Sequence, residues 1–399
     1  MAEAPWLTLV GLGEDGPEGL SPASLAALGS AEIVIGPKRH LALVGPLEAE
    51  THEWPVPFAD GLPRLLALRG RKVVVLVSGD PFWHGAGCTI TKDLQPGEWR
   101  ALPVPGCFSL AAARLGLALQ DVTCLALHAA PYDRLRPHLG PGARLIVTLR
   151  DGRAVPDLAA YLVDAGFADS RVTVMESLGG PQERLEDFIA RDQFAREFSH
   201  PVCAAIDVRG SGAVLQCCSG IADDFFDTDG QITKRPVRAL TLSALAPRPR
   251  ERLWDIGGGS GSIAIEWLLS DPTTQAVCVE VRADRAERIA GNAARLGVDR
   301  LAIVEGAAPE ALTDLPDPDA VFIGGGLSEA LLEVLFDRLP PGTRLVANAV
   351  TLESEALLAR SQSARGGTLL RIELSEAAPL GSRTGWRAAY PVVQWSVTT

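Results

Sequence analysis

The residues of this chain that say most about chemistry lie in the glycine-rich segment LWDIGGGSGSIAIEW, residues 253–267. An apolar run ends near Asp255, and four glycines follow before a helical pattern begins near Ser262. Glycine permits positive φ angles and lets the backbone approach a ligand closely. The first N–H groups of a helix attract a carboxylate or a phosphate. This spacing therefore predicts a ligand-binding turn between a strand and a helix.

Two ligand classes compete for this turn. A dinucleotide-binding loop follows the pattern G-x-G-x-x-G, but Ser262 stands where its third glycine would be. The loop instead reads D-x-G-x-G-x-G, the loop of S-adenosylmethionine (SAM)-dependent methyltransferases, and so favours SAM as the cofactor. Glu280, which lies 23 residues beyond Gly257, can accept two ribose hydroxyls in either case. An NAD-dependent dehydrogenase and a tight turn without a ligand are the alternatives.

Composition and charge argue against several other functions. With 37 Lys and Arg against 49 Asp and Glu, the formal charge of −12 argues against a nucleic-acid partner. The segment VFIGGG (321–326) lacks the motifs of enzymes that methylate nucleic-acid bases, so a small-molecule substrate is favoured. No secretory signal and no apolar run of about 18 residues is visible, which predicts a cytoplasmic protein without a membrane span. Seven scattered cysteines without a C-x-x-C pair and six histidines without ligand spacing predict no metal site.

Short β-branched runs alternate with alanine- and leucine-rich helical patterns in the first half of the chain, which predicts an α/β fold. The strands predicted there are 6–10, 32–35, 73–77, 144–149, 172–175 and 202–206. Residues 209–236 interrupt this alternation with Gly, Ser and acidic residues, so we place the domain junction in the first half of that segment. The predicted domains are residues 1–209 and 221–399.

The second half is a separate α/β unit. Its predicted strands are 253–256, 276–280, 301–305, 320–323, 344–348, 369–374 and 392–397. Helical patterns separate the first five strands, whereas the turn-rich stretch AAPLGSRTGWRAAYP joins the last two. Five strand–helix units followed by a strand pair match the order of a seven-stranded methyltransferase sheet.

Five ordered motifs of the second half carry a family resemblance. They are ITKRPVRALTLSAL (232–245), the glycine loop, VEGAAPEAL (304–312), VFIGGG and LVANAVTLE (345–353). Together they resemble the CbiT-type precorrin methyltransferases, which methylate C15 of the precorrin ring and decarboxylate its C12 acetate. The resemblance implies a seven-stranded, Rossmann-like class I methyltransferase fold over residues 221–399. Two positions depart from the family pattern. Ala307 stands where the family usually has Asp, so the backbone of Ala307 or Ala308, and not a side chain, would contact the adenine. Pro236 stands where the family usually has Glu.

The resemblance implies two sets of binding residues in this half. Those implied for SAM are Asp255, Gly257, Gly259, Ser260, Gly261, Glu280, Ala307 and Ala308. A flat macrocycle with many carboxylates needs an apolar pocket that also carries cationic groups. The substrate-binding candidates are Lys234, Arg235, Arg238, Asn348, Arg383 and Arg387. For the cationic residues the alternative is a solvated basic surface, and for Asn348 it is a turn cap.

Four segments of the first half carry a second resemblance. They are VGLGEDG (10–16), VSGDPFWHG (77–85), PGCFSLAAARLG (105–116) and VMESLGGPQERL (174–185). They resemble the CbiE-type members of the tetrapyrrole methyltransferase fold, which methylate C5 of the same ring. This implies two α/β subdomains with SAM in the cleft between them, lined by Gly11, Gly79, Asp80 and Gly85. His84 and His128 fall in loops expected to face this cleft; each is a candidate proton acceptor at C5, or has a structural role.

A fusion of these two parts in this order resembles the CobL family of precorrin-6B C5,15-methyltransferases (decarboxylating). The resemblance implies methylation at C5 and C15 with loss of the C12 carboxyl group to give precorrin-8, in cobalamin biosynthesis. It also implies a homo-oligomer, and we expect no need for pyridoxal phosphate or a metal. No motif identifies the catalytic acid or base, and Asn348, whose amide could hold a substrate carboxylate, is a further candidate catalytic residue. Two alternatives stay open: a SAM-dependent methyltransferase of another tetrapyrrole or small metabolite, and a SAM-binding protein without activity.

Overall fold

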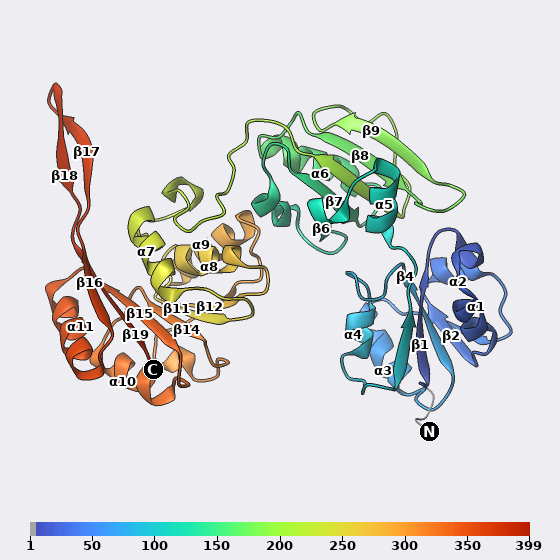
Figure 1. The fold of residues 1–399 in the computed structure, drawn as a ribbon, viewed down its shortest axis with the longest axis horizontal. Helices are drawn as coiled ribbons and strands as arrows, with labels where there is room; N and C mark the ends of the chain where they lie inside the picture. Colours follow the sequence, from blue (N-terminus) through green and yellow to red (C-terminus); the bar gives the residue numbers. More distant parts are fainter. Residues whose placement is uncertain (1–4) are drawn as a thin grey trace. The chain divides into compact units, whose positions relative to one another are not determined.

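The structure, a computed structural model, describes residues 5–399, and these form two compact units. Unit 1 comprises the described residues up to Tyr132 together with His138–Ala213, and unit 2 comprises Asp133–Pro137 with Val214–Thr399 (Figure 1). Among the described residues, no helix combines the length and the apolar character that crossing a membrane requires.

The first sheet of unit 1 contains five parallel strands in the order β3-β2-β4-β1-β5. Their bounds are β1 Leu7–Leu12, β2 Ile33–Gly36, β3 Glu50–Glu53, β4 Val73–Ser78 and β5 Trp99–Leu102. The helices of this part are α1 Pro22–Gly29, α2 Lys38–Val44, α3 Gly61–Leu66 and α4 Gly87–Thr91. All six residues of β1 are buried, because a parallel strand covered on both faces reads as a continuous apolar run.

The second sheet of unit 1 is mainly antiparallel, in the order β6-β7-β10-β8-β9. Its strands are β6 Thr123–Ala126, β7 Arg144–Leu149, β8 Arg171–Glu176, β9 Arg184–Ile189 and β10 Val202–Asp207. Helix α5 (Cys107–Leu115) precedes this sheet, and α6 (Ala154–Asp164) connects β7 to β8. Two sheets with their helices make unit 1 an α/β fold of two subdomains, as the sequence predicted.

Unit 2 is built on a seven-stranded sheet in the order β13-β12-β11-β14-β15-β19-β16, with β19 antiparallel to both of its neighbours. The strands are β11 Arg252–Ile256, β12 Gln275–Glu280, β13 Ala302–Glu305, β14 Ala320–Ile323, β15 Arg344–Ala349, β16 Thr368–Ile372 and β19 Val392–Thr398. The helices are α7 Arg235–Leu245, α8 Ser262–Ser270, α9 Ala283–Arg295, α10 Glu329–Arg338 and α11 Leu352–Arg365. All seven predicted strands are present. The strand order reverses between β11 and β14, and such a reversal opens a crevice at the carboxyl ends of the strands.

Apolar side chains fix helices to both faces of this sheet. Leu253 of β11 packs in one cluster with Ile263 and Trp267 of α8, whereas its neighbour Trp254 packs in another with Leu331 of α10. Successive residues of a strand point to opposite faces, so β11 supports helices on both sides. The turn between β11 and α8 is therefore anchored by the core at each end.

The turn-rich stretch before β19 contains a hairpin that the sequence analysis did not predict. β17 (Ser375–Leu380) and β18 (Arg383–Ala388) form an antiparallel two-stranded sheet that extends away from the seven-stranded sheet (Figure 1). Most of its residues are exposed, and Trp386 reaches 80%. The stretch lacks the apolar alternation of a half-buried strand, which is why its strands were missed.

Candidate active sites

Each unit contains a cavity that gathers residues predicted to bind SAM. The cavity of unit 2 has a volume of about 740 Å³ and lies at the carboxyl ends of β11, β12, β14 and β15. Of the residues predicted for SAM in this half, those that line it are Gly257, Gly259, Ser260, Glu280, Ala307 and Ala308. The cavity of unit 1, of about 500 Å³, is lined by residues of both its sheets.

The glycine turn between β11 and α8 forms one wall of the unit 2 cavity. Gly257, Gly259 and Gly261 have φ angles of 73°, 61° and 75°, a conformation that favours glycine. A Cβ atom on Gly257 would lie 2.6 Å from the Cα atom of Gly325, so the turn packs directly against the VFIGGG segment. Glycine alone allows both this turn and this contact, and the result is a cradle of backbone beside the cavity.

Glu280 ends β12 on the wall of the same cavity, with an exposed fraction of only 3%. Its Oε2 accepts a hydrogen bond from the N–H of Gly259 at 2.9 Å, and its Oε1 accepts one from the N–H of Arg282 at 3.1 Å. A carboxylate held by two backbone donors has a fixed direction and keeps lone pairs for further donors. This geometry suits the acceptance of hydroxyl groups from a bound ribose.

Two residues predicted to bind SAM lie behind the turn and not on the cavity wall. Asp255 is 1% exposed, and its Oδ2 accepts a hydrogen bond from the N–H of Ala264 at 3.1 Å. Burial, together with the negative charge of Glu280, raises the pKa of Asp255 to about 7. Gly261 precedes α8, and a Cβ atom there would lie 2.8 Å from Cγ2 of Ile289. Neither Asp255 nor Gly261 lines the cavity and both shape the turn, and their contact with SAM stays a prediction.

Polar atoms beside the turn lack protein partners. Among the described residues, the buried Oγ of Ser260, a residue of the cavity wall, has no hydrogen-bond partner, and neither does Oδ1 of Asp255. Buried polar groups normally find a partner, so an unpaired hydroxyl beside a glycine cradle fits a polar ligand. The cradle, this hydroxyl and the carboxylate of Glu280 together fit a nucleoside cofactor such as SAM.

The basic residues predicted to bind substrate occupy three different environments. Lys234 lines the cavity with a largely exposed side chain. Arg235 lies outside the cavity wall and donates a hydrogen bond to a glutamine side chain at 3.3 Å. Arg238 is fully buried: its guanidinium pairs with Glu266 at 2.5 Å and with Asp223 at 3.0 Å, and it donates to two backbone carbonyls. The prediction that Arg238 binds substrate is wrong, because its guanidinium is buried and already paired, and Arg235 is not brought to the site.

Asn348 lines the cavity at the end of β15, as predicted, but its amide is already engaged. Nδ2 donates to Oγ1 of Thr241 at 2.9 Å, and Oδ1 accepts from Nε2 of Gln394 at 3.0 Å. Arg383 and Arg387 lie on the exposed strand β18 and do not line the cavity. The hairpin holds both arginines in solvent, and their contact with substrate stays a prediction.

An apolar rim at the mouth of this cavity was missed by the sequence analysis. Val281, Val350 and Tyr390 line the cavity with exposed fractions of 63%, 66% and 89%. They come from three separate loops, after β12, after β15 and before β19, so no local pattern marks them. Exposed apolar groups gathered at a cavity mark a binding surface, and this one suits the flat face of a macrocycle.

In unit 1, Gly79 and Gly85 line the cavity, whereas Gly11 and Asp80 do not. Gly79 follows β4 with a φ of 56°, and a Cβ atom on Gly11 would lie 2.0 Å from the carbonyl oxygen of Gly79. Oδ1 of Asp80 accepts a hydrogen bond from the N–H of Phe82 at 2.8 Å, which stabilises the turn. Gly11 lets β1 and the turn after β4 approach closely, and Asp80 stabilises that turn; their contact with SAM stays a prediction.

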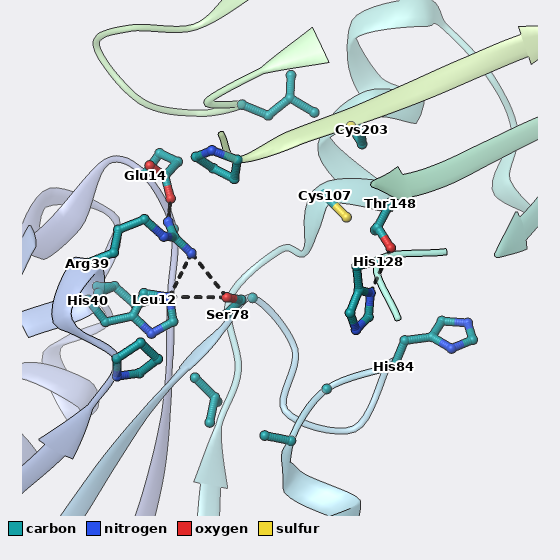
Figure 2. A pocket seen from close by; sticks show the side chains of 18 of the residues that line it. Leu12, Glu14, Arg39, His40, Ser78, His84, Cys107, His128, Thr148 and Cys203 are labelled. Atoms are coloured by element: carbon teal, nitrogen blue, oxygen red, sulfur yellow. Dashed lines mark hydrogen bonds and ion pairs between the residues drawn. The ribbon is translucent and has the colours of Figure 1, made fainter. Parts of the chain in front are cut away.

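Four of the six histidines of the chain line the unit 1 cavity. The two predicted ones, His84 and His128, lie near one another, and Nδ1 of His128 is 3.1 Å from Oγ1 of Thr148 (Figure 2). Burial, and then the nearby His128, lowers the pKa of His84. The other two, His40 and His200, were missed, because neither belongs to a motif with chemical spacing.

Two thiols line the unit 1 cavity, those of Cys107 and Cys203 (Figure 2). Burial raises the pKa of Cys107 to about 11, and it raises the pKa of Cys203 well above its usual value. Both groups are therefore neutral thiols near neutral pH, whereas the thiolate is the nucleophilic form. These side chains give the cavity an unreactive wall that does not compete for a methyl group.

Two family models match the chain: tetrapyrrole (corrin/porphyrin) methylases over residues 6–190, and a precorrin methyltransferase domain over residues 224–399. A precorrin-6Y C(5,15)-methyltransferase (decarboxylating) of Sinorhizobium sp. is 50% identical over 400 residues, covering 99% of this chain and 97% of the relative. Its namesake from Mycobacterium tuberculosis (strain ATCC 25618 / H37Rv) is 42% identical over 401 residues, covering 98% and 99%. A solved structure, the C-terminal domain of precorrin-6Y C5,15-methyltransferase from Rhodobacter capsulatus, is 53% identical, covers 46% of this chain and 100% of its own, and has a TM-score of 0.45.

Proposed function

The chain belongs to the family of precorrin-6Y C5,15-methyltransferases (decarboxylating), SAM-dependent enzymes of cobalamin biosynthesis, and we propose that its two halves divide the reactions. Residues 1–209 methylate C5 of the precorrin ring. Residues 221–399 methylate C15 and remove the carboxyl group of the C12 acetate, so that the final product is precorrin-8. The observation that supports this division is that each unit has its own cavity built on a glycine turn.

The cavity of unit 2 aligns the ring with the cofactor. When bound, SAM supplies a methyl group on a positively charged sulfur. The turn at Gly257 and Gly259 and the carboxylate of Glu280 would hold the cofactor, and the backbone of Ala307 and Ala308 would border its adenine. The apolar rim and Lys234 hold the macrocycle over it. An in-line displacement with a good leaving group needs alignment and exclusion of water more than acid–base catalysis, which agrees with the absence of a catalytic dyad from the motifs.

Methylation at C5 replaces a hydrogen, so a proton must leave the ring after the new C–C bond forms. His84 and His128 are the candidate acceptors in unit 1, because both line the cavity. The lowered pKa of His84 keeps its imidazole neutral and able to accept a proton. The contact of Nδ1 of His128 with Thr148 at 3.1 Å fixes the orientation of that ring.

Decarboxylation breaks the bond between the carboxyl carbon and the methylene carbon of the C12 acetate. The electron pair of that bond enters the conjugated ring, CO2 leaves, and the methylene carbon then takes up a proton to become a methyl group. Because the ring itself is the electron sink, we propose that neither a metal nor pyridoxal phosphate takes part. Dependence of CO2 release on a removable metal or on added pyridoxal phosphate would refute this.

Equilibrium dialysis of the full-length chain with labelled SAM tests the division of labour. We expect two sites per chain, of which Gly79→Val removes one and Gly257→Val removes the other. With precorrin-6Y and 13C-methyl SAM, the first variant should lose only C5 methylation and the second only C15 methylation. A single site per chain, or loss of both SAM sites from one folded variant, contradicts the division. Methyl transfer to another tetrapyrrole or a small metabolite, with none to the precorrin, would favour the alternative substrate.

We further propose that the chain forms a homo-oligomer. An isolated two-stranded hairpin is marginally stable in water, yet β17–β18 exposes Leu380 and Trp386 at 70% and 80%. Coverage of this hairpin by a second copy would remove that apolar surface from water. Light scattering of the full chain should give a multiple of the monomer mass, and a monomer at micromolar concentration contradicts the proposal. A cytoplasmic location stays a prediction of the sequence.

A further inference from the structure

Two arginines line the mainly apolar cavity of unit 1, although the chain as a whole is acidic. The formal charge of the chain is −12. Among the described residues that line the cavity, Arg39 and Arg150 carry a positive charge and Glu14 is the single acidic side chain, whereas Arg150 also pairs with Asp151 at 3.2 Å. A guanidinium group on the wall of a cavity attracts anions, even inside an acidic protein. The cavity is therefore suited to a ligand that carries carboxylates.

Arg39 is braced on the wall of this cavity by three side chains. It lies at the start of α2, and its Nη1 pairs with a carboxylate oxygen of Glu14 (Figure 2). Its Nη2 lies 2.9 Å from Nε2 of His40 and 3.4 Å from Oγ of Ser78, which is itself 3.1 Å from Nε2 of His40. These contacts account for three of the five N–H donors of a guanidinium, and 31% of the side chain stays exposed.

His40 fixes the direction of the guanidinium because it is a neutral acceptor. Burial, together with the positive charge of Arg39, lowers the pKa of His40 to about 4. The carbonyl oxygen of Leu76, 3.5 Å from Nδ1, can only accept, so the ring proton belongs on Nδ1. Nε2 then accepts a hydrogen bond from Arg39. The cation is held in place by Glu14 and His40 together and does not swing freely into solvent.

We propose that Arg39 binds a carboxylate of the precorrin in the C5-methylation site, with Glu14 and His40 as positioning residues; this rests on the proposed function. The fork of a guanidinium matches a carboxylate, and a carboxylate that enters an apolar cavity needs such a partner. Figure 2 places Arg39 across the cavity from His84 and His128. An acid group anchored at Arg39 restricts rotation of the macrocycle, so Arg39 helps to decide which ring carbon faces the methyl donor.

Steady-state kinetics of the full-length chain test this role. Arg39→Gln should raise KM for the precorrin in C5 methylation by about tenfold to a hundredfold, the range for a hydrogen bond to a charged group, with kcat changed far less. The dissociation constant of SAM and the kinetics of C15 methylation should stay as in the wild type. Arg39→Lys keeps the charge without the fork and should recover part of the affinity. Arg64→Gln, a change of an exposed arginine on α3, is the matched control and should alter nothing.

The other outcomes contradict either the role of Arg39 or the proposed function on which it rests. An unchanged KM in Arg39→Gln refutes the role of Arg39 and leaves the proposed function intact. An equal loss of SAM affinity in Arg39→Gln and Arg39→Lys, accompanied by a lower melting temperature, assigns Arg39 to structure and also refutes it. If the wild-type chain transfers no methyl group to C5, the proposed function itself fails, and that result precedes any variant.

Discussion

Both cavities contain a glycine turn, but the cavity of unit 1 adds a group of charged and titratable side chains to its wall, which the cavity of unit 2 has to a lesser degree. In unit 2, glycines at positive φ turn the chain beside the ligand space, and Glu280 is fixed by two backbone N–H groups. In unit 1, Glu14, Arg39 and His40 support one another on the wall. A backbone cradle tolerates no added atom, but a wall of side chains can lose one group and keep its shape. Substitutions of the turn glycines should therefore act in an all-or-none way, and substitutions of the wall side chains of unit 1 in a graded way.

The largest effect should come from an added side chain in the unit 2 turn. In Gly257→Val, the new Cβ atom would lie 2.6 Å from the backbone of Gly325, at a φ of 73°. We expect C15 methylation to fall by at least about 100-fold, since displacement by about 1 Å is enough for such a loss. C5 methylation should persist. Gly291→Ala is the control, because no atom lies within 4 Å of its Cβ position in α9; an equal loss there would show that the unit is merely fragile.

The second-largest effect concerns stability, because Arg238 is paired inside the protein, whereas Arg39 is proposed to bind the substrate. Arg238 is fully buried against Glu266, so Arg238→Met leaves an unpaired buried carboxylate and should lower the free energy of unfolding by about 3–5 kcal/mol. Denaturant unfolding measures this. Arg371→Met is the matched control, because its exposed pair with Glu373 should contribute at most about 1 kcal/mol. A raised KM in Arg238→Met without lost stability would return Arg238 to the substrate site.

The spacing of α7 contains the signal that Arg238 is structural. Four buried residues of α7 have the spacing of one helix face. They are Arg238 and, three, four and seven residues after it, Thr241, Leu242 and Leu245. An arginine on the inner face of a helix has to be paired inside the protein. The sequence analysis considered only the cationic character of this segment, and for that reason it placed Arg238 on the substrate.

The strands show which part of the fold a sequence can reveal. In unit 1 the six predicted strands are the interior ones, and the four missed strands, β3, β5, β6 and β9, are the edges of the two sheets. No residue of these four strands is fully buried. Because the side chains of these four strands are exposed or half-buried, no apolar periodicity marks them. His40 and His200 were missed for a related reason: they reach the cavity through the fold and belong to no local motif.

The buried carboxyl group of Asp255 should make the stability of unit 2 depend on pH. Its folded-state pKa of about 7 lies above the unfolded value near 3.8, so the folded protein keeps a proton that the unfolded chain releases. The stabilisation is fully present below pH 4 and is lost as the pH rises to 7. The free energy of unfolding of the wild type minus that of Asp255→Asn, without cofactor, should therefore fall by up to about 4 kcal/mol between pH 4 and pH 8. A flat difference across this range would mean that Asp255 is ionised in the fold.

In unit 1, loss of one catalytic candidate should be graded and confined to one product. His128→Ala should lower C5 methylation by about 100-fold, the lower range for a general base, while C15 methylation in the same chain stays unchanged. His52→Ala, a change of an exposed histidine on β3, is the control and should leave both rates alone. The position of the methyl group, read by 13C NMR of the product, separates the two activities. Unchanged C5 methylation in His128→Ala would leave His84 as the candidate.

The smallest effect should come from the hairpin of unit 2, where the sequence predicted two substrate contacts. Arg383 and Arg387 lie on exposed β18 outside the cavity wall, and salt screens their charges in solvent. The double variant Arg383→Gln/Arg387→Gln should therefore change KM for C15 methylation by less than about twofold, the effect of weakly coupled solvent-exposed charges. Lys234→Gln, a change on the cavity wall, should raise this KM more than the double hairpin variant does. A tenfold rise in KM in the hairpin variant would mean that β17–β18 covers a cavity during turnover, either in the same chain or in another copy. Unit 2 would then also depend on fixed charges to bind its substrate.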